Sequence, residues 1–531
     1  MRCILILLLF VTLSSCSGDK DGLFEGLSAE EIDLSVTLKE KFGETENLIF
    51  SNDTLLASKE VLTYYKENEF IPIWTTAEGL NEKGTEFVQL INESFKFGFL
   101  PEMFHATLIK QTLDSSLVDT ELILSNAFFL FDTHISVGCV DSSTYKYVWK
   151  KDKITYSLTE ELTKIRKGDK VRETILAHQP DFWEYHQLQK GLSNFLDSFD
   201  LDTNHYVIPA IKEDSLNCYL TAKNALQGHD FLTEKAAADD TLFLNQLKKF
   251  QQLNGLKPDA VIGKWTGKAL EKSNLDRFYQ AALSLEKWRW QAPRPARYIR
   301  VNIPEFYLYY VDSAQTISKH RVVVGAYATQ TPEFQAQMER MVTNPFWHVP
   351  YSISSTEILV GARKDTSYFN KRGYKVFKGG AEVDPKNVDW KAVKENNFQY
   401  RIRQEAGGGN SLGRIKFLFP NEHSVFIHDT PSKSLFGNDV RAYSHGCVRL
   451  QDPFELAKKI LASENHKMLP DELDSVVKKG QQKVLELSEP FAVYIEYFTA
   501  SADSNDVIIF HPDIYGLDEK YIKRSYKPFV P

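Results

Sequence analysis

A cysteine and two histidines near the end of the chain have the types and spacing that covalent catalysis needs. The segment Ser444–Arg449 reads Ser-His-Gly-Cys-Val-Arg, and His428 precedes it. A cysteine attacks as its thiolate, and a nearby imidazole both lowers the thiol pKa and accepts its proton. Gly446 lets the backbone approach a bound substrate, and adjacent N–H groups can receive a developing oxyanion. The pattern indicates a candidate nucleophile, Cys447, although most lone Cys–His pairs in sequences are not catalytic.

Strands and a helix must position these residues. Polar and apolar residues alternate along Ser424–His428, which places His428 at the end of a strand, on the face that Ser424 and Phe426 share. The two apolar residues between them face the core. Segment 452–461 reads as a capped amphipathic helix with proline in its first turn. We therefore expect Cys447 on a strand-to-helix connection.

The spacing of apolar residues divides the rest of the chain into a helical part and a mainly β part. From Leu62 to about Leu226, apolar residues recur at three- and four-residue spacing, which predicts a helical scaffold. Residues 240–273 predict a small helical hairpin interrupted at Asn254-Gly255. Gln291–Pro295 breaks helical structure, and from Tyr298 to about Ile514 the period changes toward two. The expected fold class is multidomain α+β: a helical scaffold and small helical module, then a mainly β domain.

Composition excludes several classes of protein. The chain has 531 residues, 63 Lys+Arg and 71 Asp+Glu, for a net charge of −8. At about 150 residues per domain, this length predicts about three domains. Hydrophobic residues make up 43% and charged residues 25%, which excludes a disordered or collagenous chain. A pI near 6.0 argues against nucleic acid as a partner, and a mean hydropathy of −0.33 excludes a polytopic membrane protein.

The N-terminus predicts export. One arginine precedes the apolar run Ile4–Leu13, which is too short to span a bilayer. The following Ser-Ser-Cys resembles the bacterial lipobox, and this resemblance implies cleavage after residue 15 and a lipid on Cys16; a plain secretory signal is the alternative. Ser17 favours the outer membrane. We therefore expect a periplasm-facing lipoprotein of the bacterial cell envelope.

Five cysteines in the whole chain exclude a disulfide-dense scaffold. Cys3 is expected to leave with the signal peptide. Cys139 and Cys218 lie in apolar contexts that suit buried packing, and a disulfide between them stays open.

The segment around Cys447 resembles the active-site signature of the YkuD-type L,D-transpeptidases, which reads His, a spacer, then Ser/Thr-His-Gly-Cys. Further segments resemble the large YcbB-like subgroup in the same order: Arg300–Pro304, Asn344–Pro350, Gly413–Pro420, His428–Lys433 and His511–Gly516. That subgroup carries an N-terminal scaffold domain and an inserted peptidoglycan-binding module. Residues 240–273 resemble such a module, with a mere spacer as the alternative.

The resemblance implies a peptidoglycan L,D-transpeptidase that uses no metal and no other cofactor. Cys447 would attack the carbonyl between the third residue of a stem peptide and its terminal D-alanine. An amine of a second stem would resolve the thioester into a 3→3 cross-link, with His428 as general base. The resemblance also implies that carbapenems acylate Cys447.

Six further residues are candidates for the substrate and oxyanion pocket: Ser444, His445, Gly446, Arg449, Trp347 and Phe426. Arg449 suits a substrate carboxylate, with a structural ion pair as the alternative. Trp347 suits the donor groove, with core packing as the alternative. Either the Asp429 side chain or a backbone carbonyl can orient His428.

The expected domain order is a signal peptide (1–15), a tether (16–55), the scaffold (56–235), the peptidoglycan-binding-like module (236–275), a linker (276–297), the catalytic domain (298–518) and a tail (519–531). An insertion at about 351–410 is expected to form a lid, with Gly407–Gly409 as its flexible part. The expected partners are peptidoglycan stem peptides and glycan, together with a membrane through the lipid anchor.

Other functions stay open at this stage. The same fold can act as an L,D-carboxypeptidase or cross-link hydrolase if water resolves the thioester. A lipoprotein that tethers peptidoglycan without catalysis is an alternative of another class. A sortase also uses His, Cys and Arg, but these usually lie much farther apart in the sequence. No His/Asp/Glu cluster in the sequence has metal-ligand spacing.

Overall fold

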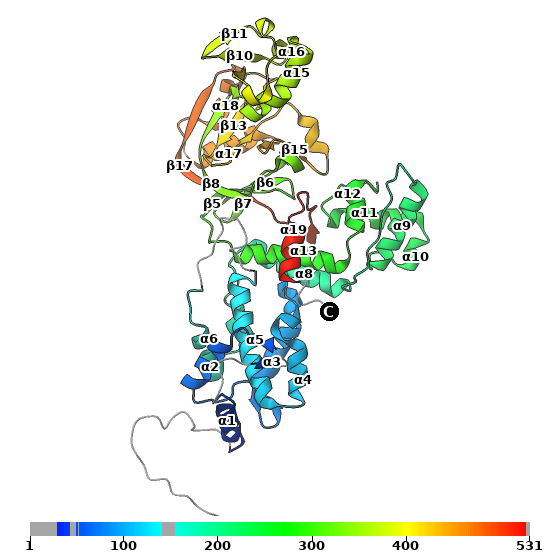
Figure 1. Ribbon diagram of the computed structural model, residues 1–531, viewed down its shortest axis with the longest axis vertical. Coiled ribbons are helices and arrows are strands. Elements are labelled where there is room, and N and C mark those ends of the chain that lie inside the picture. The colour runs from blue at the N-terminus through cyan, green and yellow to red at the C-terminus, as the bar shows by residue number, and fades with distance from the viewer. Residues whose placement is uncertain (1–28, 43–48, 51–52, 141–153, 465, 527–531) are drawn as a thin grey trace, which may run out of the picture. The chain divides into compact units, whose positions relative to one another are not determined.

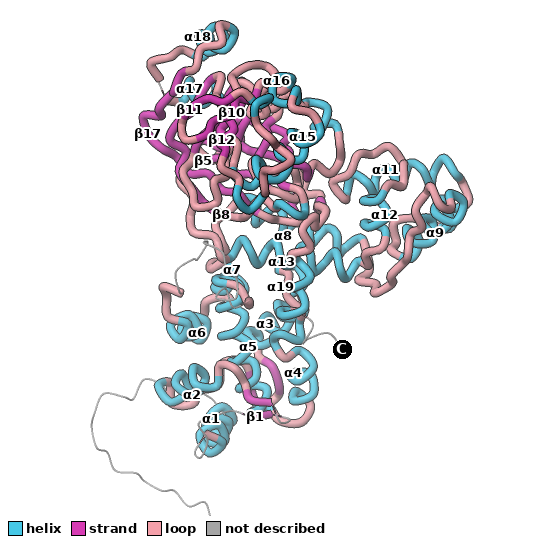
Figure 2. The backbone as a smooth tube through the Cα atoms, turned by 45° about the horizontal axis from the view of Figure 1, so that its top comes forward, coloured by secondary structure: helices cyan, strands magenta, loops and turns pink. Residues whose placement is uncertain are grey.

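The computed structural model describes residues 29–42, 49–50, 53–140, 154–464 and 466–526. The predicted signal peptide 1–15 and lipid site Cys16 lie outside the described residues. The chain forms two compact units: residues up to 92, 104–132 and 157–175 make the first, and 93–103, 133–156 and 176–531 make the second. Figure 2 shows that the strands, in magenta, gather in the second unit. No helix in the described ranges is both long and apolar enough to cross a membrane.

The first unit is mainly helical, as the three- and four-residue spacing predicts. Two short hairpins join its helices: β1 (Ile49–Phe50) pairs with β2 (Asp53–Thr54), and β3 (Thr75–Thr76) pairs with β4 (Gly79–Leu80). The helices are α1 (Ala29–Lys41), α2 (Ser58–Glu67), α3 (Glu82–Asn92), α4 (Ala106–Leu113), α5 (Leu117–Val137), α6 (Leu158–Lys167) and α7 (Val171–Leu176).

A buried carboxylate anchors the core of the first unit. Trp74 packs on Phe87 and Phe128, with ring centroids 5.1 and 6.1 Å apart. Glu121 of α5 is fully buried and accepts hydrogen bonds from the backbone N–H groups of Trp74 and Thr75, at 3.0 and 2.9 Å. Burial raises the pKa of Glu121, and these donors offset part of the desolvation cost.

The helical part of the second unit contains the predicted hairpin. On α11 (Asp240–Leu253) one buried face carries Phe243, Leu247 and Phe250. The helix ends before Gly255, whose φ of +62° suits glycine. The second helix, α12 (Lys264–Leu270), follows Gly263. The other helices are α8 (Trp183–Ser198), α9 (Ser215–Gly228), α10 (Glu234–Ala237), α13 (Asn274–Arg289) and α19 (Asp518–Ser525).

Residues 276–297, expected to be a linker, lie mostly in α13, a helix that is buried on nearly every face. Its charged side chains have partners inside the core: Arg289 forms an ion pair with Glu286 at 3.3 Å, and Lys287 Nζ donates to the Tyr497 carbonyl at 2.6 Å. This pairing lets a polar sequence form a core helix. Figure 1 shows α19, in red, beside α13.

The mainly β part is one nine-stranded sheet in the order β15-β7-β16-β14-β13-β8-β17-β5-β6. Because β6 also pairs with β7, the order from β7 to β6 closes into a ring. Most neighbours are antiparallel, but the pairs β15–β7, β16–β14 and β17–β5 run parallel. The strands are β5 (Arg297–Asn302), β6 (Tyr307–Asp312), β7 (Gln315–Gly325), β8 (Phe334–Thr343), β13 (Ile415–Leu418), β14 (Ile427–His428), β15 (Ala442–Ser444), β16 (Val448–Leu450) and β17 (Lys483–Glu496).

The core of this sheet includes Val425 and Ile427, as the alternation predicts. Two helices, α17 (Pro453–Ser463) and α18 (Pro470–Lys478), contribute buried side chains to the same core. The expected cap of α17 is wrong: Asp452 precedes the helix at φ +51° and makes no side-chain capping bond. The short pair β18 (Ala500–Ala502) and β19 (Ile508–Phe510) follows β17.

The predicted insertion is a small folded layer with its own core. A four-stranded sheet has the order β11-β10-β12-β9, and its core includes Phe369, Trp390 and Ile402. The strands are β9 (Trp347–His348), β10 (Tyr374–Lys378), β11 (Ala381–Val383) and β12 (Tyr400–Gln404). Its helices are α14 (Tyr351–Ile353), a π-helical turn (Ser354–Ile358), α15 (Leu359–Lys364) and α16 (Ser367–Lys371).

Candidate active site

Two adjacent parallel strands bring His428 and Cys447 to one cavity. His428 on β14 pairs with Arg449 on β16, and the Val448 N–H donates to the Phe426 carbonyl at 3.1 Å. Cys447 directly precedes β16, and both Cys447 and His428 line a cavity of about 1010 Å³. The expected strand-to-helix connection is wrong, because Cys447 lies in a turn between β15 and β16 and α17 begins only after β16.

Hydroxyl groups hold the turn that carries the nucleophile. Ser444 Oγ accepts from the Gly446 N–H at 3.1 Å and donates to the Cys447 carbonyl at 2.5 Å. Thr331 Oγ1 donates to the Gly446 carbonyl at 2.7 Å, and Thr329 Oγ1 donates to the Ser444 carbonyl at 2.8 Å. Gly446 has φ +113°, which L side chains rarely adopt. Ser444 therefore shapes the turn, whereas the two threonines could not be found from the sequence, because each lies 115 residues before the residue of the turn that it contacts.

The imidazole of His428 is oriented by a backbone carbonyl. His428 Nδ1 lies 2.6 Å from the Asp429 carbonyl oxygen, which can only accept, so Nδ1 carries the hydrogen and Nε2 keeps a lone pair. The Asp429 carboxylate instead accepts from the N–H groups of Thr430 and Arg414 at 2.7 and 2.8 Å and from Lys433 Nζ at 2.5 Å. The sequence left two groups open as the partner that orients His428. In the structure this partner is the backbone carbonyl of Asp429 and not its carboxylate.

Burial keeps both reactive groups neutral at rest. The pKa of His428 is lowered to about 4, mainly by burial and also by the charges of Arg449 and Lys416, although contacts with Asp429 oppose this shift. Burial also raises the pKa of the Cys447 thiol. This direction is opposite to the sequence-based expectation. Within the described chain no hydrogen bond joins the two groups, and Cys447 Sγ lies 3.8 Å from the Ser424 carbonyl.

The sequence led us to expect that backbone N–H groups near Cys447 could receive an oxyanion. The Gly446 N–H is bonded to Ser444 Oγ. In the described residues the Cys447 N–H has no hydrogen-bond partner. The Cys447 N–H could therefore donate to an oxyanion that formed beside Sγ.

Comparison with known proteins agrees with this geometry. Residues 296–480 match the L,D-transpeptidase catalytic domain YkuD, and residues 59–192 match the Scaffold domain. The chain therefore contains an L,D-transpeptidase catalytic domain of the YkuD type, preceded by a Scaffold domain. A relative described as a putative L,D-transpeptidase, from Haemophilus influenzae, is 32% identical over 223 residues, which are 42% of this chain and 45% of the relative. The chain thus spans less than half the length of that relative.

The two matches confirm the expected fold class, a helical scaffold followed by a mainly β L,D-transpeptidase domain, and their order agrees with the YcbB-like subgroup. Within the described residues, no group of three or more His, Cys, Asp or Glu side chains could hold a metal ion. Cys139, Cys218 and Cys447 are free thiols, so Cys139 and Cys218 do not form the disulfide left open above.

Two cationic side chains flank His428 in the cavity that Cys447 lines. Lys416 on β13 pairs directly with His428, which pairs directly with Arg449, so the three side chains share one face. All three line the cavity, and among the described residues neither Lys416 nor Arg449 forms an ion pair. The structural ion pair considered for Arg449 is thus not found. Lys416 was missed because its place beside His428 depends on pairing between distant strands.

The remaining predicted residues lie where the sheet meets the inserted layer. Trp347 lines the cavity and also packs against the core of the insertion. Phe426 lines the cavity, with its ring 5.5 Å from that of His428. His445 is exposed and pairs with Glu357 of the π-helical turn. This pair joins the nucleophile turn to the insertion.

Proposed function

We propose that this protein is a peptidoglycan L,D-transpeptidase that forms 3→3 cross-links through a thioester on Cys447. The observation that carries the proposal is the row of Lys416, His428 and Arg449 beside Cys447 in one cavity. A thiol and an imidazole supply acyl-transfer chemistry, and two unpaired cations suit a substrate that carries carboxylates.

Acylation begins when a tetrapeptide stem fills the cavity. His428 Nε2 takes the thiol proton as Sγ attacks the carbonyl carbon before the terminal D-alanine, and the Cys447 N–H receives the oxyanion. The tetrahedral intermediate collapses, the C–N bond breaks, and the imidazolium gives its proton to the leaving nitrogen. D-Alanine departs and the thioester remains.

Transfer reverses the same proton path. An amine of a second stem attacks the thioester carbonyl, its proton passes to His428, and the C–S bond breaks. The thiolate recovers a proton from the imidazolium, and the two stems are joined by a new amide. The inserted layer, paired with the nucleophile turn through Glu357 and His445, would limit the access of water to the thioester.

The two cations have separate roles in this scheme. Arg449 lies on the strand that follows Cys447, and its planar fork suits a bidentate contact with the carboxylate of the terminal D-alanine. Lys416 lies on the other side of His428 and suits a carboxylate of the stem residue that becomes the acyl group. Both roles rest on proximity to the base and on the lack of an acidic partner.

The test is the product distribution from purified tetrapeptide muropeptides, measured by mass spectrometry. The intact protein should release D-alanine and give dimers whose mass equals two stems joined with loss of one D-alanine. Cys447→Ala should abolish both products, while Cys218→Ala, which removes a buried thiol on α9, should leave them unchanged. Tripeptide monomers without dimers would instead identify a carboxypeptidase and overturn the transpeptidase proposal.

The lipobox-like segment supports a further part of the proposal, that the protein is a lipoprotein of the periplasm, anchored through Cys16, with the outer membrane favoured. The module 236–275 is proposed to contact glycan. Membrane fractionation of intact protein and Cys16→Ala provides the test, because the variant should move to the soluble fraction if the anchor is correct.

A further inference from the structure

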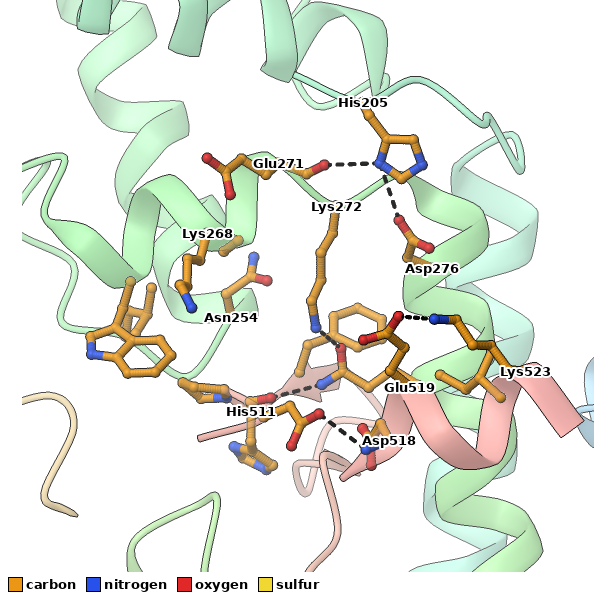
Figure 3. A pocket seen from close by; sticks show the side chains of 18 residues that line it. His205, Asn254, Lys268, Glu271, Lys272, Asp276, His511, Asp518, Glu519 and Lys523 are labelled. Atoms are coloured by element: carbon orange, nitrogen blue, oxygen red, sulfur yellow. Dashed lines mark hydrogen bonds and ion pairs between the residues drawn. The ribbon is translucent and has the colours of Figure 1, made fainter. Parts of the chain in front are cut away.

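A second cavity, of about 580 Å³, lies in the second unit and shares no lining residue with the Cys447 cavity. Its walls come from the α11–α12 hairpin, the start of α13, the segment after β19 and α19 (Figure 3). Trp265, Phe510 and Ile522 supply apolar surface. The volume lies in the range of small-ligand sites, about 300–1000 Å³.

Two lysines on one side of this cavity have no acidic partner. Lys268 on α12 and Lys272, one helical turn later, both line it, and Figure 3 shows Lys272 extending inward. Lys272 Nζ contacts Gln280 Oε1 at 2.7 Å, and Lys268 Nζ lies 5.2 Å from the centroid of the Trp265 ring. Neither ammonium forms an ion pair with any described residue. Burial lowers the pKa of Lys272, while Asp518 and Asp513 oppose that shift from a distance.

The acidic residues on the side of the cavity opposite these lysines have hydrogen-bond or ion-pair partners within the protein, except for one carboxylate oxygen of Asp518. Glu519 pairs with Lys523, and Asp513 accepts from the Tyr497 hydroxyl at 2.5 Å and from the N–H groups of Leu517 and Asp518 at 3.0 and 3.1 Å. Asp518 is 4% exposed, and its Oδ2 accepts from Thr499, but its Oδ1 is buried with no hydrogen-bond partner in the described structure.

We propose that this cavity binds an α-amino-acid zwitterion, a free ammonium and a free carboxylate on one carbon, at the end of a peptidoglycan stem. The carboxylate would contact Lys268 and Lys272, and the ammonium would face Asp518. A neutral sugar would leave both lysines unpaired, and a simple anion would face the carboxylates of α19 and its preceding loop. The identity of the stem as the source rests on the proposed function; the zwitterion chemistry does not.

The experiment is isothermal titration of the full chain carrying Cys447→Ala with a synthetic stem tripeptide that ends in a free diamino-acid residue. Lys272→Met and Asp518→Asn, each added to this chain, should weaken the binding at this cavity about tenfold or more, since each removes a charge-assisted hydrogen bond. Lys248→Met on the same chain is the matched control, because Lys248 is exposed on α11 and lines neither cavity, so it should spare this binding.

Modified probes test the chemistry without depending on how the variants fold. Two modified tripeptides change only the carbon of the diamino-acid residue that carries both charges: one is acetylated on its amine and the other is amidated on its carboxylate. Each should bind the unaltered cavity about tenfold more weakly. Equal binding of all three probes, or full binding by Lys272→Met and Asp518→Asn chains with unchanged melting temperatures, would overturn the proposal. In the chain with intact Cys447, Lys272→Met should form dimers at a rate within about twofold of that of the unaltered chain. A failure of the cavity proposal can therefore be told apart from a failure of the proposed transpeptidase function.

Discussion

Tyr515 is expected to control the position of the nucleophile from outside the cavity, and Tyr515→Phe is the change that tests this. The Tyr515 hydroxyl donates to the Gly325 carbonyl at 2.7 Å and accepts from the Thr331 N–H at 3.1 Å. Thr331 Oγ1 in turn donates to the Gly446 carbonyl at 2.7 Å. Two hydrogen bonds therefore link Tyr515 to the residue beside Cys447.

The size of the effect follows from these contacts. Tyr515 is 4% exposed, so phenylalanine would leave the Thr331 N–H and the Gly325 carbonyl without this partner in a site closed to water. Each lost hydrogen bond costs about 1 kcal/mol, and more if the group stays unsatisfied, for a total of about 2 kcal/mol or more. In a domain of this size that corresponds to a fall in melting temperature of roughly 4–8 °C.

Activity should fall by more than the loss of stability explains. A shift of the Gly446 carbonyl moves the Cys447 amide and Sγ together, and small displacements of reacting groups cost up to about a hundredfold in rate. We expect kcat for D-alanine release to fall about tenfold or more at a temperature where the variant is folded, with KM little changed. Calorimetry and steady-state kinetics on the same preparation provide both values.

Tyr310→Phe is the matched control. Tyr310 is also buried, and its hydroxyl is 2.8 Å from Ser463 Oγ, far in the chain from the nucleophile turn. This variant should lose about 1 kcal/mol of stability and keep its kcat. Thr331→Ser should retain most activity, whereas Thr331→Val should resemble Tyr515→Phe. The reasoning is refuted if Tyr515→Phe keeps full kcat, or if only KM changes.

Three further outcomes follow from the site. Gly413→Ala should lower the free energy of unfolding by about 2 kcal/mol or more in chemical denaturation, since Gly413 has φ +59° and a Cβ there would lie 2.3 Å from the Asp429 carboxyl carbon. Iodoacetamide should alkylate resting Cys447 at a rate that still rises above pH 8, because burial raises the thiol pKa and lowers the pKa of His428 to about 4; a rate plateau below pH 7 would contradict this. Lys416→Met should reduce kcat/KM for the tetrapeptide about tenfold. It should leave kcat/KM unchanged for a tetrapeptide in which the carboxylate assigned to Lys416, on the residue that becomes the acyl group, is amidated. Equal losses on the two substrates would contradict the role assigned to Lys416.

Local patterns in the sequence predict those structural features that depend on residues close together in the chain. Alternation is enough to place Val425 and Ile427 in the core and His428 on the opposite face. The helical hairpin follows from apolar spacing and from Asn254-Gly255 in the same way. The nucleophile and base were expected from one short motif, and the structure brings them to one cavity.

What the sequence did not predict depends on pairing between distant segments. Lys416 and Arg449 lie beside His428 only because β13, β14 and β16 are neighbours in this register. The direction of the Cys447 pKa shift depends on burial by the whole cavity wall. Residues 276–297 were expected to be a linker, but most of them form the core helix α13, whose ion pair between Arg289 and Glu286 depends on the folded unit.

The chain beyond residue 480 belongs to the machinery of the active site, although the catalytic-domain match ends there. Strand β17 lies between β8 and β5 and pairs with both. Without it, two central strands would expose unpaired edges and the ring would open. Tyr515 lies later still, and its hydroxyl connects β7 to the turn of Cys447 through Thr331. Residues 296–480 thus contain Cys447 and His428, but the hydrogen bonds and strand pairing that position them require the chain as far as Tyr515.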